Sequence, residues 1–184
     1  MGIESATDLV EAAISDEKLL EGYRDGDLHS FAQLYSRYAR PLYLYLRAMI
    51  RDSNEAEDAA QEIFIRLLDQ DRSVTCGSVR TYLYAMARHL VVDRARRQTV
   101  RARTATCMLL VSRPNARDRN ADLEDAVSQA LLSLPEEQRE VIILKIYANM
   151  TFAEIAALGD QSPGTVMSRY RYGLEKLART LKKE

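Results

Sequence analysis

Apolar residues recur three or four positions apart along most of this 184-residue chain. The segments 28–50 and 54–68 show this spacing clearly. Such spacing places apolar side chains on one face of an α-helix, and no stretch alternates convincingly as a half-buried strand would. The sequence therefore predicts an all-α protein, with Pro41 expected to bend or interrupt the helix in which it lies. Further helices are expected over 7–14, 78–98 and 123–132, from Pro135, over 151–158, and from Pro163.

The formal net charge of −1 conceals an uneven distribution. Residues 1–75 hold 8 basic and 15 acidic residues, residues 76–119 hold 10 and 2, and residues 120–184 hold 8 and 10. A basic band between two acidic ends suggests that a polyanion contacts the centre of the chain. A solvated charged surface is the alternative interpretation.

The helical pattern fades from residue 99 to 122, where arginines accumulate without apolar periodicity. This composition is typical of a flexible basic linker. We therefore expect two small helical domains, 1–98 and 123–184, joined by a flexible linker over 99–122. Within the linker, the apolar residues 107–111 are expected to form either a transient helix or a segment that docks on a partner.

Composition excludes several classes of protein. No apolar run approaches the ~20 residues of a membrane span, and the acidic start is unlike a signal peptide, so a cytoplasmic protein without membrane insertion is expected. Cys76 and Cys107 lack the spacing of a zinc site or a disulfide framework. With His29 and His89 as the two histidines and no phosphate-binding glycine loop, an enzyme is a poor fit, and neither a cofactor nor a metal is expected.

Helix start and stop signals are clear near the C-terminus. Thr151 and Glu154 have the spacing of a capping box, and Gly159 is placed to end that helix. Ser162 and Pro163 begin the next one. A short capped helix, a tight turn and a longer helix form the layout of a helix-turn-helix, whose second helix reads DNA with its N-terminal residues. An amphipathic hairpin with a solvated face is the alternative.

The second helix of this pair divides into two sides at 100° per residue. The side expected to face the core holds Val166, Tyr170, Leu174, Leu177 and Leu181. The other side, with Arg169 on its flank, holds Thr165, Ser168, Arg171 and Tyr172.

The C-terminal sequence "SLPEEQREVIILKIYANMTFAEIAALGDQSPGTVMSRYRYGLEKLARTL" resembles region 4 of bacterial sigma factors of the extracytoplasmic-function (ECF) group. The stretch "DAAQEIFIRLL" resembles the region 2 helix that grips core RNA polymerase, and "TYLYAMARHLVVDRARR" resembles the helix that melts and reads the −10 element. The resemblance covers about residues 20–98 and 123–182, in the family's order. Tyr82 stands where the family usually has tryptophan, and His89 stands where it often has asparagine. The resemblance therefore does not predict which −10 sequence the chain prefers.

The resemblance implies a sigma factor that binds core RNA polymerase and directs promoter-specific transcription initiation. An anti-sigma factor is a further partner that it allows. For the −35 element, the implied DNA-binding residues are Thr165, Ser168, Arg169, Arg171 and Tyr172. For the −10 element they are Tyr82, Tyr84, Arg88, His89, Val92 and Arg96. Those implied for core polymerase are Glu57, Asp58, Gln61, Glu62 and Arg66.

Simple chemistry agrees with these roles. In the 78–98 helix, Tyr82 and Tyr84 are expected at the borders of the apolar stripe, with Arg88 opposite it, and aromatic rings beside arginines suit single-stranded bases. The acidic helix 54–68, with a capping box expected at Asn54, suits a basic protein surface better than DNA. Two alternatives remain: a helix-turn-helix regulator that acts without core polymerase, and a helical adaptor that does not bind DNA.

Overall fold

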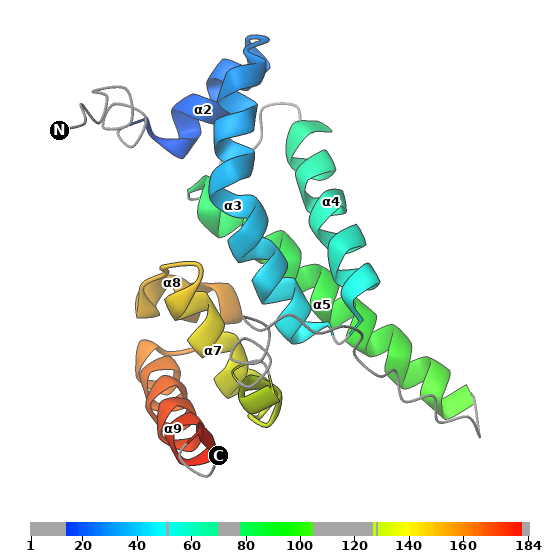
Figure 1. Ribbon diagram of the computed structural model, residues 1–184, viewed down its shortest axis with the longest axis vertical. Helices are drawn as coiled ribbons and strands as arrows, with labels where there is room; N and C mark the ends of the chain where they lie inside the picture. The colour runs from blue at the N-terminus through cyan, green and yellow to red at the C-terminus, as the bar shows by residue number, and fades with distance from the viewer. Residues whose placement is uncertain (1–13, 51, 70–77, 105–126, 128, 182–184) are drawn as a thin grey trace, which may run out of the picture.

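The computed structural model describes residues 14–50, 52–69, 78–104, 127 and 129–181. Every regular element within these ranges is a helix, as the apolar spacing predicts. The part of the linker beyond residue 104, its 107–111 segment, both cysteines and all but the last residue of the predicted 7–14 helix lie outside the described residues. In chain order the helices are α2 (Asp16–Arg24), α3 (Leu28–Met49), α4 (Ser53–Asp69), α5 (Val79–Thr104), α7 (Glu136–Ile146), α8 (Phe152–Gly159) and α9 (Pro163–Leu181) (Figure 1).

Helix α3 is the central helix of the N-terminal half and packs against α2, α4 and α5. Its inward residues Leu34, Leu42 and Leu46 are completely buried. Ile63 of α4 and Leu83 of α5 join them in one hydrophobic core. The apolar stripes predicted for these three helices therefore meet one another.

Pro41 does not interrupt α3, which is continuous from Leu28 to Met49. A proline inside a helix costs about 3 kcal/mol, because it removes a hydrogen bond and crowds the preceding turn. Buried leucines on both sides of Pro41, including Leu34 and Leu42, anchor the two halves of α3 in the same core. Tertiary packing therefore offsets the local cost, and the predicted interruption is wrong.

The caps predicted for α8 and α9 are confirmed. Thr151 Oγ1 accepts from the Glu154 backbone N–H at 3.2 Å, and the Glu154 carboxylate accepts from the Thr151 N–H at 2.7 Å. Ser162 Oγ accepts from the Thr165 N–H at 3.1 Å at the start of α9. Helix α8 ends at Gly159 as predicted, and the following Asp160 takes the left-handed conformation at φ 51°.

The start of α4 differs from the prediction. The Asp52 carboxylate accepts from the backbone N–H groups of Asn54 and Glu55, at 2.9 and 3.1 Å. Helix α4 consequently begins at Ser53, and Asn54 lies within its first turn. Asp52 caps the helix because its carboxylate accepts hydrogen bonds from two otherwise unpaired N–H groups. Its negative charge is also stabilised by the positive end of the helix dipole.

Helix α9 packs against α7 and α8 in the C-terminal half. Val166 is completely buried, whereas Leu174 and Leu181 are 37% and 43% exposed, so the prediction of a core stripe along the whole helix is wrong. Helix α9 has 19 residues and α7 has 11, so α9 extends about 12 Å beyond what α7 can cover. A Cβ at Gly173 would lie 2.6 Å from Ile142 of α7, which shows how closely the two helices pack.

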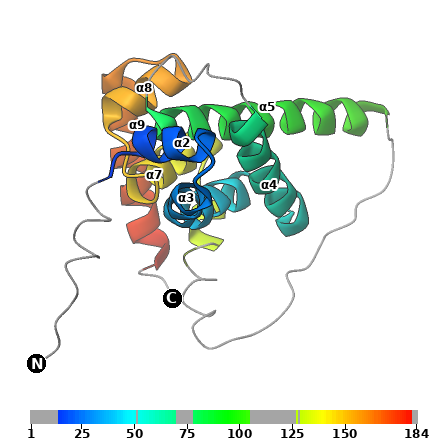
Figure 2. The same cartoon turned by 90° about the horizontal axis from the view of Figure 1, so that it is seen from above.

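The two halves share a core in this structure. Helix α7 lies against α3, and α8 lies against the beginning of α5 (Figures 1 and 2). Val141 and Leu144 of α7 belong to the same buried cluster as Leu46 of α3 and Leu83 of α5. Helix α5 extends to Thr104, so the first six residues of the predicted linker are helical. They contain neither glycine nor proline, and nothing local ends the helix at Gln98.

None of the described helices is both long enough and apolar enough to cross a membrane.

Candidate nucleic-acid and protein interfaces

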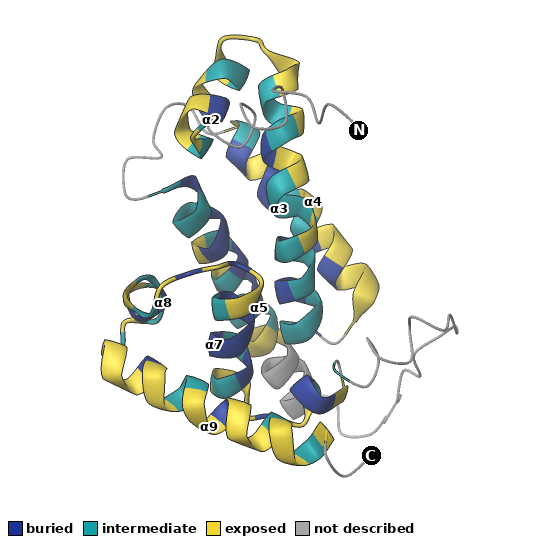
Figure 3. Cartoon of the chain, turned by 60° about the vertical axis from the view of Figure 1, so that its left-hand side comes forward, coloured by how far each residue is buried: buried dark blue, intermediate teal, exposed yellow. Residues whose placement is uncertain are grey.

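The N-terminal part of α9 presents an exposed polar surface, which we call the α9 face: Thr165, Met167, Ser168, Arg171 and Tyr172. Buried Val166 holds the opposite side of the helix in the core, and the left-handed Asp160 turns the chain between α8 and α9. Figure 3 shows α9 exposed along most of its length. The helix-turn-helix arrangement therefore leaves the polar side of its second helix accessible to a ligand.

The two arginines predicted to contact DNA lie in different surroundings. Arg171 is exposed, and its guanidinium lies 4.9 Å from the centre of the Tyr172 ring, a cation–π contact. The Arg169 side chain is 28% exposed and donates to Gln161 Oε1 at 2.7 Å, with Glu137 of α7 at 3.9 Å. Arg169 thus ties α9 to the turn and to α7, whereas Arg171 extends from the α9 face.

Met167, which was not among the residues predicted from the sequence, is 54% exposed on the α9 face. Its apolar side chain lies one residue after Val166 and one before Ser168, so helix geometry places it beside the polar residues. Thymine is distinguished in the major groove by a methyl group, which an apolar side chain can contact. The signal for Met167 was available in the sequence as an apolar residue outside the core stripe.

Helix α5 carries a second polar surface, which we call the α5 face: Tyr82, Arg88, His89, Val92 and Arg96. His89 and Arg96 are exposed, whereas Tyr82, Arg88 and Val92 are half-buried. His89 lies 3.7 Å from the Asp93 carboxylate one turn along.

Tyr84 is not on this surface. Its ring is completely buried and meets the Tyr45 ring edge-on, with centroids 5.6 Å apart. Burial raises the pKa of the Tyr84 hydroxyl above its usual value. The predicted position of Tyr84 at the border of the stripe is wrong, because α3 packs against α5 and brings the Tyr45 ring onto Tyr84.

Arg88 meets an acidic residue of the C-terminal half. Its Nε donates to Glu140 Oε1 of α7 at 3.1 Å, and the hydroxyl of Tyr45 in α3 donates to the same oxygen at 3.0 Å. Burial, and then the adjacent Glu140 charge, raise the pKa of the Tyr45 hydroxyl well above its usual value. We call this arrangement the Glu140 contact, and sequence reasoning could not find it, because Arg88 and Glu140 are 52 positions apart.

One turn before Tyr84, Arg80 makes a second contact between the halves. It donates to the Glu154 carboxylate at 2.6 Å and to the Asn149 carbonyl at 3.3 Å. Burial acts to raise the pKa of Glu154, but the hydrogen bonds from Thr151 and the ion pair with Arg80 outweigh it and lower that pKa.

The acidic surface predicted on α4 is present. Glu57, Asp58 and Gln61 are exposed, and half-buried Glu62 binds Arg66 through an ion pair of 2.5 Å. Glu62 and Arg66 are therefore paired with each other in this structure.

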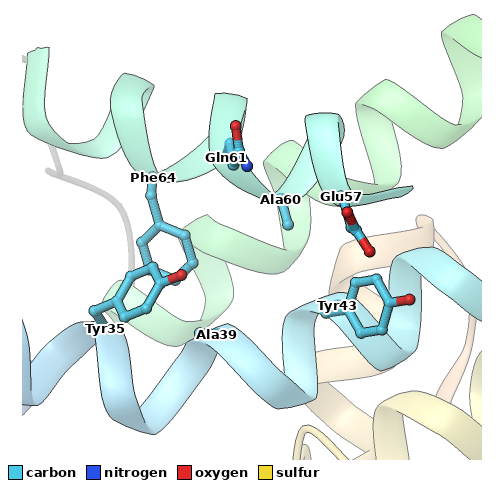
Figure 4. Close-up of a pocket in the computed structure, with 7 residues that line it drawn as sticks. All are labelled: Tyr35, Ala39, Tyr43, Glu57, Ala60, Gln61 and Phe64. Atoms are coloured by element: carbon cyan, nitrogen blue, oxygen red, sulfur yellow. The ribbon is translucent and has the colours of Figure 1, made fainter. Parts of the chain in front are cut away.

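A cavity of about 310 Å³ opens between this surface and α3 (Figure 4). At one end the rings of Tyr35 and Phe64 approach with centroids 4.7 Å apart, and at the other Tyr43 lies near Glu57. Tyr35 recurs at helical spacing with the apolar residues of α3, yet it is 47% exposed. The lining residues are Tyr35, Ala39, Tyr43, Glu57, Ala60, Gln61 and Phe64.

Each half of the chain matches a known protein family. Residues 34–101 match the family model of Sigma-70 region 2, and residues 124–177 match that of Sigma-70 region 4. The solved structure of the sigma factor RpoE in complex with the anti-sigma factor NepR, from Bartonella quintana, has the same fold, with a TM-score of 0.72 at 22% identity. It covers 84% of this chain and 98% of that chain.

Curated relatives extend the match over nearly the whole chain. ECF RNA polymerase sigma factor SigM of Mycobacterium tuberculosis is 31% identical over 91% of this chain and 85% of its own length. ECF RNA polymerase sigma factor SigW of Bacillus subtilis is 28% identical over 90% of this chain and 96% of its own length. With region 2 and region 4 in the family's order, the chain belongs to the ECF group of RNA polymerase sigma factors, which direct RNA polymerase to promoters.

Proposed function

We propose that this sigma factor reads the −35 element of its promoters with the α9 face and the −10 element with the α5 face. The observation that carries this proposal is the exposed polar side of α9, held outward by buried Val166 in a capped helix-turn-helix. The N-terminal residues of such a helix reach base edges in the major groove.

The residues of the α9 face suit distinct parts of DNA. Arg171 can bond the acceptor edge of guanine or a phosphate, and the Ser168 hydroxyl can bond several bases. Met167 fits a thymine methyl group. Thr165 lies at the helix start, where its hydroxyl bonds Ser162 at 2.9 Å and a phosphate is favoured by the helix dipole.

On α5, the proposal rests on fewer residues than the sequence indicated. Tyr82 and His89 are the rings available for stacking on single-stranded bases, and Arg96 is an exposed countercharge for the backbone. Arg88 joins them when it is released from Glu140.

We further propose that core polymerase binds the acidic surface of α4. An apolar side chain of the polymerase then enters the cavity between α4 and α3. The exposed carboxylates of Glu57 and Asp58 complement a basic surface, and the rings of Tyr35, Tyr43 and Phe64 offer apolar contact. An anti-sigma factor is a further proposed partner. The division into domains 1–98 and 123–184 is also a proposal. The length of α5 supports a linker that starts after Thr104.

The test is run-off transcription by core polymerase with this chain on a library of genomic fragments. A double variant, Asp58→Lys with Glu62→Lys, should weaken binding to core polymerase at least about tenfold, because it places positive charge against a basic partner. The matched control is Glu21→Lys with Asp25→Lys, equal in charge change and exposed at α2. Equal affinity of the two double variants for core polymerase would refute the α4 assignment.

A further inference from the structure

Packing accounts for Tyr170 of α9 but not for Tyr172. The Tyr170 ring is half-buried and meets the Phe152 ring of α8 edge-on, with centroids 5.4 Å apart. Tyr172 is instead 52% exposed on the α9 face. The contact that the structure gives its ring is with Arg171, whose guanidinium carbon lies over the ring at 4.9 Å from its centre. This distance is within the range of a cation–π interaction.

The ring, rather than a carboxylate of α9, holds the Arg171 guanidinium in the part of the chain that the structure describes. Glu175 lies one turn further along α9, at the spacing that favours an ion pair with Arg171. Its carboxylate is instead 4.0 Å from Arg179, the next arginine in that direction. The direction of the Arg171 side chain therefore depends on Tyr172.

The ring contact directs Arg171 toward the middle of the α9 face. At 100° per residue, Thr165, Ser168 and Tyr172 fall within about 60° of one another and form a column along the helix. Arg171 begins about 100° to one side of Tyr172, at the border of the face. Because its guanidinium lies over the Tyr172 ring, the charge is brought back toward this column.

The contact also leaves the hydrogen-bond donors of Arg171 available. A cation–π interaction holds the guanidinium through its charge, so the N–H groups at its edge can still bond a ligand. Arg169 differs, since it donates to Gln161 Oε1 at 2.7 Å. A guanidinium held in this way can offer two donors to the O6 and N7 acceptors of guanine, and it loses less freedom when it binds.

We propose that Tyr172 is a positioning residue, whose ring holds Arg171 so that the guanidinium bonds the edge of a guanine in the −35 element. Tyr172 then strengthens promoter binding through Arg171 and not through a DNA contact of its own. The inference rests on the proposed function, because it assumes that the α9 face reads the −35 element. It predicts that Tyr172 matters for binding only while Arg171 is present.

The test is a double-mutant cycle in holoenzyme, with core polymerase and the full-length chain. The probe is a fluorescein-labelled DNA fragment that carries the strongest promoter from the run-off library. Tyr172→Leu should weaken binding about two- to fivefold, the value of an exposed cation–π contact. Arg171→Ala should weaken it at least about fivefold. Adding Tyr172→Leu to Arg171→Ala should cause no further loss, because the two residues act as one unit.

The conservative variant Tyr172→Phe is the matched control. It keeps the aromatic ring and removes the hydroxyl, so it should recover most of the affinity that Tyr172→Leu loses. A loss from Tyr172→Phe as large as that from Tyr172→Leu would assign the effect to the hydroxyl and overturn the positioning role. So would an equal loss from Tyr172→Leu with and without Arg171→Ala, since the side chain would then contact DNA itself.

Modified bases test the predicted guanine directly. Each guanine of the −35 element is replaced in turn by 7-deazaguanine, which lacks the N7 acceptor. Wild-type holoenzyme should lose about threefold or more in affinity at one position. Arg171→Ala should be insensitive to the same replacement, and Tyr172→Leu should lose less than wild type does. Wild-type binding that no replacement weakens would overturn the inference.

The two proposals fail in different ways. Wild-type holoenzyme that is sensitive to single-base changes in the −35 element, together with no loss from Tyr172→Leu, refutes the positioning role and leaves the proposed function standing. Wild-type holoenzyme that binds every −35 variant alike contradicts the proposed role of the α9 face and overturns the inference with it.

Discussion

The two surfaces proposed to bind DNA are built alike but differ in how accessible they are. Each lies on a helix with its apolar side in a core, which Val166 anchors for α9 and Leu83 for α5. The α9 face is exposed, and Arg171 extends from it. On the α5 face, Arg88 is bound by Glu140 from the other half. An amphipathic helix therefore defines a binding surface, while its neighbours decide whether that surface is accessible.

The largest expected effect separates the two sides of α9. Val166→Asp should unfold the C-terminal half, with a loss of at least about 3 kcal/mol, because it buries an unpaired carboxylate. Thr165→Asp, one residue earlier and exposed, should keep the melting temperature and abolish promoter binding by charge repulsion. Circular dichroism melting and promoter binding measure the two effects. A Val166→Asp chain that melts like wild type would show that this side of α9 is not a core face.

A smaller effect should distinguish the exposed arginine of α9 from the one bound to the turn. Arg171→Ala should weaken the free energy of promoter binding by about 1–3 kcal/mol. If Arg171 reads guanine, the loss should appear as reduced discrimination at one promoter position, and if it binds phosphate, all promoter sequences should be weakened alike. Arg169→Ala should instead lower stability by about 1 kcal/mol, through loss of the Gln161 hydrogen bond. Binding to a set of single-base promoter variants and thermal melting of both proteins check this. The reverse pattern would mean that Arg169 leaves Gln161 when DNA binds.

The smallest expected effect concerns a single methyl group. If Met167 contacts thymine, replacing that thymine by deoxyuridine should weaken wild-type binding by about 0.8 kcal/mol, the value of one buried methylene. Met167→Ala should bind both DNAs with nearly equal affinity. Replacing the thymines of the −35 element one at a time locates the contact. If wild type is insensitive to every replacement, the α9 face does not use Met167 for base reading.

Short-range patterns in the sequence determined the helices and much of the α9 face. The capping box of Thr151 and Glu154 and the cap at Ser162 involve residues three positions apart, and such contacts form within one segment whatever surrounds it. The inward position of Val166 follows from helical geometry for the same reason. The order of the region 2 and region 4 motifs was also sufficient to identify the family.

Which surfaces are covered depends on how the helices pack against one another. Tyr82 and Tyr84 are two positions apart in one helix, yet Tyr84 is buried because α3 brings Tyr45 against it. Arg88 is bound because α7 brings Glu140 to it, and Leu181 is exposed because α7 is shorter than α9. Periodicity reports the stripe of one isolated helix, whereas burial depends on how many neighbours the helix has and how far along it they reach.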